Sequence, residues 1–215
     1  KYVEQVTTYP STTVHKSYFT DENGYLILPQ NLACGNYRIE EVTAPDGYTH
    51  SANTVEIKVD SDTAYQEDPV SGDLIIEVEF ENHPAKGRLT IHKEGEVVKG
   101  FDKDFTYEEA SLAGAVFEVY AAEDIYTLDG VMHYAKGEIV DRIATGSDGV
   151  ASSKELYLGK YEIREITAPH GMVLNGTIQT VELTYAGQEV AITETAGNLY
   201  NERQKVKISL SKVLE

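Results

Sequence analysis

An eleven-residue stretch that occurs twice constrains the fold of this chain more than any other feature of its sequence. It reads YRIEEVTAPDG at residues 37–47 and YEIREITAPHG at residues 161–171. Each copy has the alternation and the β-branched residues of a strand, and each stops at a Pro-x-Gly turn. Because successive side chains of a strand point to opposite faces, Glu41 and Glu165 each end an otherwise apolar stripe. A carboxylate placed there twice needs a chemical reason.

A second repeated pattern places a lysine at a fixed distance after an asparagine. Lys93 and Lys212 each end an apolar stripe, and each follows an asparagine, Asn82 or Asn201, by eleven positions. Two patterns that recur in matched order indicate a tandem repeat. They predict a domain that lacks its first strands (1–86), a complete domain (87–203) and the first strand of a following domain (204–215).

Short β-rich segments with turn signals between them, and no long helical periodicity, predict an all-β chain of tandem antiparallel β-sandwich domains. Residues 60–73 and 94–109 are expected to be polar loops, and one helical turn is expected within 121–129. Cys34 is interpreted as a small packed residue, because it has no neighbours that would activate a thiol. Besides the repeated stretches, strands are expected at residues 55–59, 74–80, 113–120, 180–183 and 189–193, the last two as a hairpin.

The charge balance excludes several classes of partner. The chain has 18 basic and 36 acidic residues, a formal net charge of −18, which repels nucleic acid and anionic membranes. No stretch is long and apolar enough to span a bilayer, so no membrane contact is expected of this segment. A single cysteine excludes an internal disulfide, and the histidines have no ligand spacing, so neither a metal nor another cofactor is expected.

One chemical reaction accounts for the lysine, the glutamate and the asparagine on the inward stripes. Each is costly to bury alone, and burial disfavours the charged forms of an amine and of a carboxyl group. A neutral amine is a nucleophile, and the asparagine amide is an acyl electrophile. A protonated glutamate can hydrogen-bond the amide carbonyl and pass a proton to the departing ammonia. The product is a Lys–Asn isopeptide bond, formed in one self-directed turnover because the groups are held together at high effective molarity.

These residues resemble the isopeptide-forming Cna B-type (SpaA-like, prealbumin-like) domains of Gram-positive surface adhesins and pilins. The pattern Tyr-x-Ile-x-Glu-x-x-Ala-Pro-x-Gly is similar to the E-box of that family, and both copies match it. For the domain at 87–203, the resemblance implies that Lys93 is the nucleophile, Glu165 the catalytic acid and base, and Asn201 the electrophile.

The resemblance extends to the two incomplete parts. It implies a catalytic role for Glu41 and an acceptor role for Asn82, although residues 1–86 offer no lysine on a first strand. Lys212 fits the lysine role of a following domain. The sequence departs from the family pattern in two respects. The first is that Met172 stands where Tyr48 supplies an aromatic residue in the first copy. The second is that no sortase motif or pilin lysine motif is present, so polymerisation into a pilus is not predicted.

We therefore predict an extracellular stalk or adhesin segment whose partners are neighbouring domains, attached to the cell wall through parts outside this fragment. It is not expected to be an enzyme. The alternative is a binding module that recognises a host protein or glycan through the loops at 60–73 and 94–109. A glycosidase with paired glutamates is disfavoured, because the candidate acids lie in matching repeats, one to each core.

The first part of the chain raises a further expectation. A domain without its first strands would expose strand edges and leave Glu41 and Asn82 without their lysine. Val206–Lys212 has the sequence of the missing strand. One hypothesis is that it adds as a strand to residues 1–86 of another molecule, where Lys212 could bond to Asn82. The alternative is that residues upstream of this fragment supply the missing strands.

Overall fold

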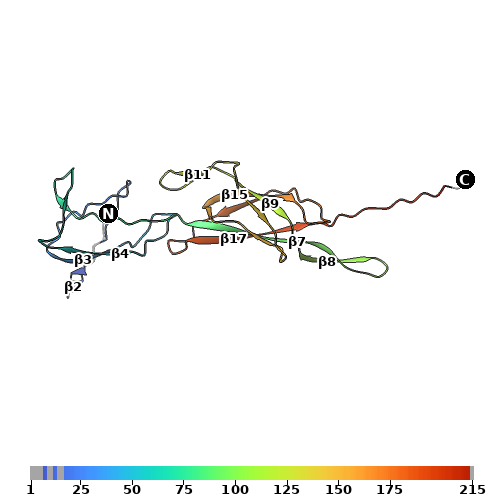
Figure 1. Ribbon diagram of the computed structural model, residues 1–215, viewed down its shortest axis with the longest axis horizontal. Helices are drawn as coiled ribbons and strands as arrows, with labels where there is room; N and C mark the ends of the chain where they lie inside the picture. Colours follow the sequence, from blue (N-terminus) through green and yellow to red (C-terminus); the bar gives the residue numbers. More distant parts are fainter. Residues whose placement is uncertain (1–6, 9–11, 14–16, 214–215) are drawn as a thin grey trace. The chain divides into compact units, whose positions relative to one another are not determined.

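The computed structural model describes residues 7–8, 12–13 and 17–213, and Figure 1 shows its strands. The described residues form strands and no helix, so the all-β fold class is confirmed. Accordingly, none of them belongs to a helix that could cross a membrane. The chain divides into two compact units, unit 1 (1–44 and 50–82) and unit 2 (45–49 and 83–215). The domain boundaries expected from the repeats stay predictions.

The described residues of unit 1 form three antiparallel strand pairs. The longest joins β3 (Gly35–Glu40) to β4 (Thr54–Val59), so Glu41 follows directly after its strand. The strand expected at 74–80 is shorter than predicted, because residues 76–82 pair with no strand among the described residues. The two short pairs are β1 (Thr7–Thr8) with β2 (Thr12–Thr13), and β5 (Gln66–Glu67) with β6 (Leu74–Ile75).

Unit 2 contains two larger sheets and a small hairpin. Every strand of the first sheet pairs with the long β7 (Lys86–Phe101): β8 (Phe105–Ser111), β13 (Val150–Ser152), β14 (Leu156–Tyr157) and β17 (Ile192–Asn201). The second sheet has the order β12 (Ile139–Ala144), β9 (Val116–Ala121), β15 (Gly159–Thr167) and β16 (Gln179–Leu183). The hairpin pairs β10 (Ile125–Tyr126) with β11 (Met132–Tyr134).

The core of unit 2 is built from the inward faces of both sheets. Leu89 and Ile91 on β7 belong to one buried cluster with Phe117 on β9 and with Tyr161 and Ile163 on β15. Full burial of such side chains contributes about 1.5–3 kcal/mol each. The Tyr161 hydroxyl donates a hydrogen bond to the Tyr157 carbonyl four residues earlier, which gives its polar end a partner inside the apolar core.

The pairing of β7 with β17 is the only parallel one among the described strands. Its register sets Leu199 opposite Lys93 and Asn201 opposite Gly95. Side chains on alternate positions of β7 and β17 therefore point into the core together. This pairing brings the ends of two distant segments, near residues 93 and 201, to the same place.

Several local expectations were wrong. Residues 94–109 form most of a hairpin between β7 and β8, because their charged side chains occupy outward positions of an extended strand. The predicted hairpin at 180–193 does not form, since β16 pairs with β15 and β17 pairs with β7. The helical turn within 121–129 is replaced by β10. Cys34 is exposed instead of packed.

Candidate functional site

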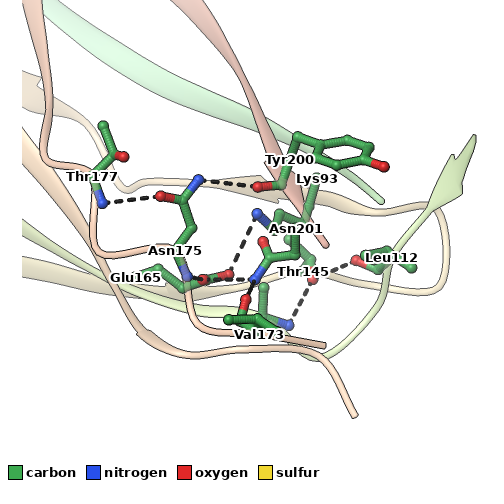
Figure 2. A network of polar contacts seen from close by, with 10 residues as sticks. Lys93, Leu112, Thr145, Glu165, Val173, Asn175, Thr177, Tyr200 and Asn201 are labelled. Carbon is green, nitrogen blue, oxygen red and sulfur yellow. Dashed lines mark hydrogen bonds and ion pairs between the residues drawn. The ribbon is translucent and has the colours of Figure 1, made fainter. Parts of the chain in front are cut away.

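The three polar residues predicted for residues 87–203 meet inside unit 2. Lys93 lies on β7, Glu165 on β15 of the facing sheet, and Asn201 is the last residue of β17. Their exposed fractions are 1%, 8% and 1%, so all three are buried. Figure 2 shows the three side chains converging, with the Glu165 carboxylate in contact with both of the others.

One carboxyl group connects the amine to the amide. Lys93 Nζ lies 3.4 Å from Glu165 Oε1, an ion pair without a formed hydrogen bond. Asn201 Nδ2 donates hydrogen bonds to Glu165 Oε2 (2.9 Å) and to the Val173 carbonyl (2.6 Å). The backbone amide of Asn175 donates a third bond, 2.7 Å long, to Glu165 Oε2. The carboxylate is thereby fixed between the two groups that would react.

Burial lowers the pKa of Lys93, and the charge of Glu165 opposes that shift only in part. The ammonium also lies 5.9 Å from the centre of the Phe117 ring, so one side of its surroundings is apolar. A lower pKa enlarges the fraction of lysine that is a neutral amine. Burial thus increases the share of the nucleophilic form relative to an exposed lysine.

The cluster leaves three polar atoms without a hydrogen bond. They are Lys93 Nζ, Glu165 Oε1 and Asn201 Oδ1, three of only five such buried side-chain atoms among the described residues. A buried unsatisfied polar group costs about 1–3 kcal/mol, so native proteins rarely gather several at one point. In one respect the structure differs from expectation, because Glu165 faces the nitrogen of the Asn201 amide and not its carbonyl oxygen.

Two backbone features position Asn201 and Glu165: the Pro-x-Gly turn that the sequence predicted, whose contacts with the site it did not reveal, and a close approach of two strands at Gly95. The turn after Pro169, closed by the bond from Met172 N to the Pro169 carbonyl (3.0 Å), returns the chain so that Val173 and Asn175 reach the site. Gly95 allows β17 to approach, because a Cβ atom there would lie 2.5 Å from the Asn201 carbonyl oxygen. A glycine inside a strand is the one signal that could have indicated this close approach.

Unit 1 repeats half of this arrangement. Glu41 Oε2 accepts hydrogen bonds from Asn82 Nδ2 (2.7 Å) and from the backbone amide of Ser51 (2.6 Å). The amide donor follows its glutamate by ten residues in both units. Glu41 and Asn82 are only half-buried, and Lys58, the one lysine in the described part of unit 1, pairs with Asp60.

Lys212, the remaining predicted residue, is not part of either cluster. It is exposed, in a segment after Arg203 that forms no strand and that Figure 1 shows extending away from the sheets of unit 2. As for metals, no three ligand-type side chains of the described residues lie close enough together to hold an ion. The structure thus joins Lys93, Glu165 and Asn201, and separately Glu41 and Asn82.

Comparison with known proteins identifies the family. The family profile of the SpaA prealbumin-like fold domain matches residues 4–70 and 100–196, which is well over half of the chain. The chain belongs to the SpaA prealbumin-like family. The resemblance inferred from the two E-box-like stretches is therefore confirmed, and the prealbumin-like fold agrees with the paired sheets of unit 2.

Individual relatives share parts of the chain. The "Trypsin-resistant surface T6 protein" of Streptococcus pyogenes serotype M6 is 27% identical over 139 residues, covering 62% of this chain and 22% of that protein. A solved structure of the Bacillus anthracis TIE protein has a TM-score of 0.54 and 24% identity, covering 94% of this chain and 31% of that one. This chain spans less than a third of either relative, and the structural likeness supports the fold.

Proposed function

We propose that this chain is a structural segment of a Gram-positive surface stalk or pilin-like protein, held together by a self-formed bond between Lys93 and Asn201. The observation that carries the proposal is the Glu165 carboxylate, which contacts both the amine and the amide within a buried core. Family membership supports the structural role. The surface location is proposed from the printed name of the streptococcal relative, which describes that relative as a trypsin-resistant surface protein.

The proposed reaction balances without a cofactor or an external substrate. Lys93 Nζ, as a neutral amine, attacks Cγ of Asn201, and a new C–N bond forms. Glu165 takes the proton released from the attacking amine and passes one to Nδ2, with which Oε2 is already hydrogen-bonded. The Cγ–Nδ2 bond then breaks and one ammonia leaves. Because the groups are consumed, the reaction occurs once in each molecule and the protein is not an enzyme.

Formation of the product also removes a buried charge and an unsatisfied polar atom from the site. An amide nitrogen replaces the buried ammonium, so the core of unit 2 no longer holds a positive charge. The remaining N–H of the new bond can donate to Glu165 Oε1, which has no hydrogen bond before the reaction. Giving hydrogen-bond partners to buried polar atoms that lack them favours the product.

The decisive measurement is the intact mass of the purified chain under denaturing conditions. We expect a mass lower than that of the sequence by one ammonia, and a peptide digest in which the segments around Lys93 and Asn201 remain joined. Glu165→Ala should have the full mass. Glu162→Ala, which changes a more exposed glutamate on the same strand, is the matched control and should still lose ammonia. A wild-type chain with the full mass would refute the proposed bond.

A further inference from the structure

The turn that follows β15 is tied to β17 by a side chain that has no part in the proposed reaction. That side chain belongs to Asn175, which is half-buried. Its Oδ1 atom accepts a hydrogen bond from the backbone amide of Thr177 (2.9 Å), and its Nδ2 atom donates one to the Tyr200 carbonyl (3.0 Å). Figure 2 shows the Asn175 side chain between these two partners, beside the cluster of Lys93, Glu165 and Asn201.

We propose that Asn175 is a positioning residue for the bond between Lys93 and Asn201. Its side chain joins the turn that holds Glu165 to the strand that holds Asn201, and so fixes the carboxylate and the amide relative to each other. The inference rests on the proposed function, because it concerns the rate at which that bond forms. The hydrogen bonds of Asn175 go to Glu165 and to backbone groups, so it acts through other residues.

On the side of the turn, Asn175 holds the carboxylate with its own backbone. Its amide donates the 2.7 Å bond to Glu165 Oε2, the same oxygen that accepts the bond from Asn201 Nδ2 (2.9 Å). The bond from the amide two residues later to Asn175 Oδ1 closes a short turn at this point. The direction of the Asn175 N–H, and with it the position of Glu165 Oε2, therefore depends on this turn.

On the side of the strand, the contact lies one residue before the acceptor of the reaction. The Tyr200 carbonyl belongs to the peptide group that leads into Asn201. Among the described strands, β17 pairs only with β7, so strand pairing holds its end along one edge. Asn175 supplies a second point of attachment there. The Val173 amide supplies a third, because it donates to the Glu202 carbonyl just past Asn201 (2.8 Å).

Unit 1 contains the same turn without this tie. Ser51 stands where unit 2 has Asn175: its backbone amide donates to Glu41 Oε2 (2.6 Å), and its hydroxyl oxygen accepts a bond from the backbone amide of Asn53 (3.5 Å), two residues later. The serine side chain is shorter and has no amide group. The turn and its contact with the carboxylate are thus common to both units. The amide that ties the turn to the residue before the asparagine belongs to unit 2, where lysine, glutamate and asparagine meet.

The distances in the site indicate the size of the effect. The Glu165 carboxylate lies 3.4 Å from Lys93 Nζ and 2.9 Å from Asn201 Nδ2, and the proposed reaction needs both contacts at once. A misplacement of about 1 Å in such an arrangement slows a reaction by about 100-fold. Without the Asn175 amide, the turn and the end of β17 can shift against each other by part of that distance. We therefore expect the bond to form about 10- to 100-fold more slowly.

Asn175→Ser tests the proposal, because it removes the amide but leaves an acceptor for the turn, as in unit 1. Cell-free synthesis with an isotope pulse gives newly made chains, whose loss of ammonia is followed by intact mass. We expect Asn175→Ser to lose ammonia about 10- to 100-fold more slowly than wild type. Asn198→Ser makes the same exchange at an exposed position of β17 and should match the wild-type rate.

A second measurement separates positioning from a general loss of stability. Lys93→Met cannot form the bond, so it keeps the unlinked geometry open to measurement. In this background, Asn175→Ser should speed hydrogen exchange of the backbone amide at position 175 by about 10-fold, because its bond to Glu165 is less firmly held. The amides of β9 and β15 should exchange as before. Faster exchange throughout β9 and β15 would mean that Asn175 only stabilises the fold, and it would overturn the inference.

The possible results separate this inference from the proposed function. A wild-type chain with the full mass refutes the proposed function, and this inference falls with it. If wild type loses ammonia and Asn175→Ser loses it at the same rate, the bond stands and the inference is wrong. A slower reaction with unchanged hydrogen exchange at position 175 also overturns the inference, because the side chain would then act at another place.

Discussion

Replacing Lys93 by methionine isolates the contribution of the proposed bond to stability. Methionine fills a similar volume and brings no charge, and exchanging a buried ionic side chain for an apolar one of similar size is often close to neutral. Glu165 keeps its hydrogen bonds from Asn175 and Asn201 in this variant. The main loss would therefore be the proposed covalent link between β7 and β17.

The magnitude follows from the loop that the bond closes. Lys93 and Asn201 lie about 110 residues apart, and closing a loop of that size removes about 4–5 kcal/mol of conformational entropy from the unfolded chain. With an m value of about 3–5 kcal/mol/M in guanidinium chloride, the midpoint of unfolding of unit 2 should fall by about 1 M.

Hydrogen exchange in β9 and β15 reports the unfolding of unit 2 separately from that of unit 1. Lys99→Met is the matched control, since Lys99 lies exposed on the same strand and its ion pair with Glu108 is on the surface. The control should unfold within about 0.5 kcal/mol of the wild type. If wild type has lost ammonia and Lys93→Met still unfolds at the same midpoint, the argument from loop closure is wrong.

Three further predictions follow from the same geometry. Asn201→Ala cannot form the bond. Because the pKa of Lys93 is lowered in the folded chain, the unfolded chain of this variant binds more protons than the folded chain does. The free energy of unfolding of this variant should therefore rise with pH between that lowered pKa and about pH 10.4, by up to about 1.4 kcal/mol per pH unit. The linked wild type, titrated in parallel, is the reference. Gly95→Ala should displace β17 and slow bond formation by about 100-fold in a mass time course, whereas Gly100→Ala, whose Cβ would meet nothing closer than 3.7 Å, should not. Under force, Lys93→Met should release roughly 350–400 Å of chain from residues 93–201 when unit 2 unfolds, and a linked wild type that releases the same length would contradict the proposal.

The sequence predicted the strands that carry the site, because alternation is a local property. Tyr161, Ile163 and Glu165 point inward on β15 as their spacing indicates, and the repeats located Lys93 and Asn201. The pairing partners of the strands were not predictable in this way. The segments 180–183 and 189–193 suggested a hairpin, but β17 pairs with β7, whose residues lie about a hundred positions away.

The contacts in the site that the sequence does not reveal are made by backbone atoms. The Val173 carbonyl and the Asn175 amide hold Asn201 and Glu165, and every residue except proline carries both of these groups. The extension of β7 beyond residue 94 was missed for a different reason. Glu94 and Glu96 occupy outward positions of the strand, and so many charges in a short stretch resemble a solvated loop.

The placement of the three groups couples the proposed chemistry to correct folding. Lys93 and Asn201 lie on neighbouring strands of one sheet, whereas Glu165 comes from the facing sheet. The carboxylate can reach them only after the two sheets have packed. A slip of β17 by one residue against β7 would turn the Asn201 side chain to the outer face of the sheet, away from Glu165. Only a molecule with both the right pairing and the right register could therefore undergo the proposed reaction, and the bond would make that one arrangement permanent.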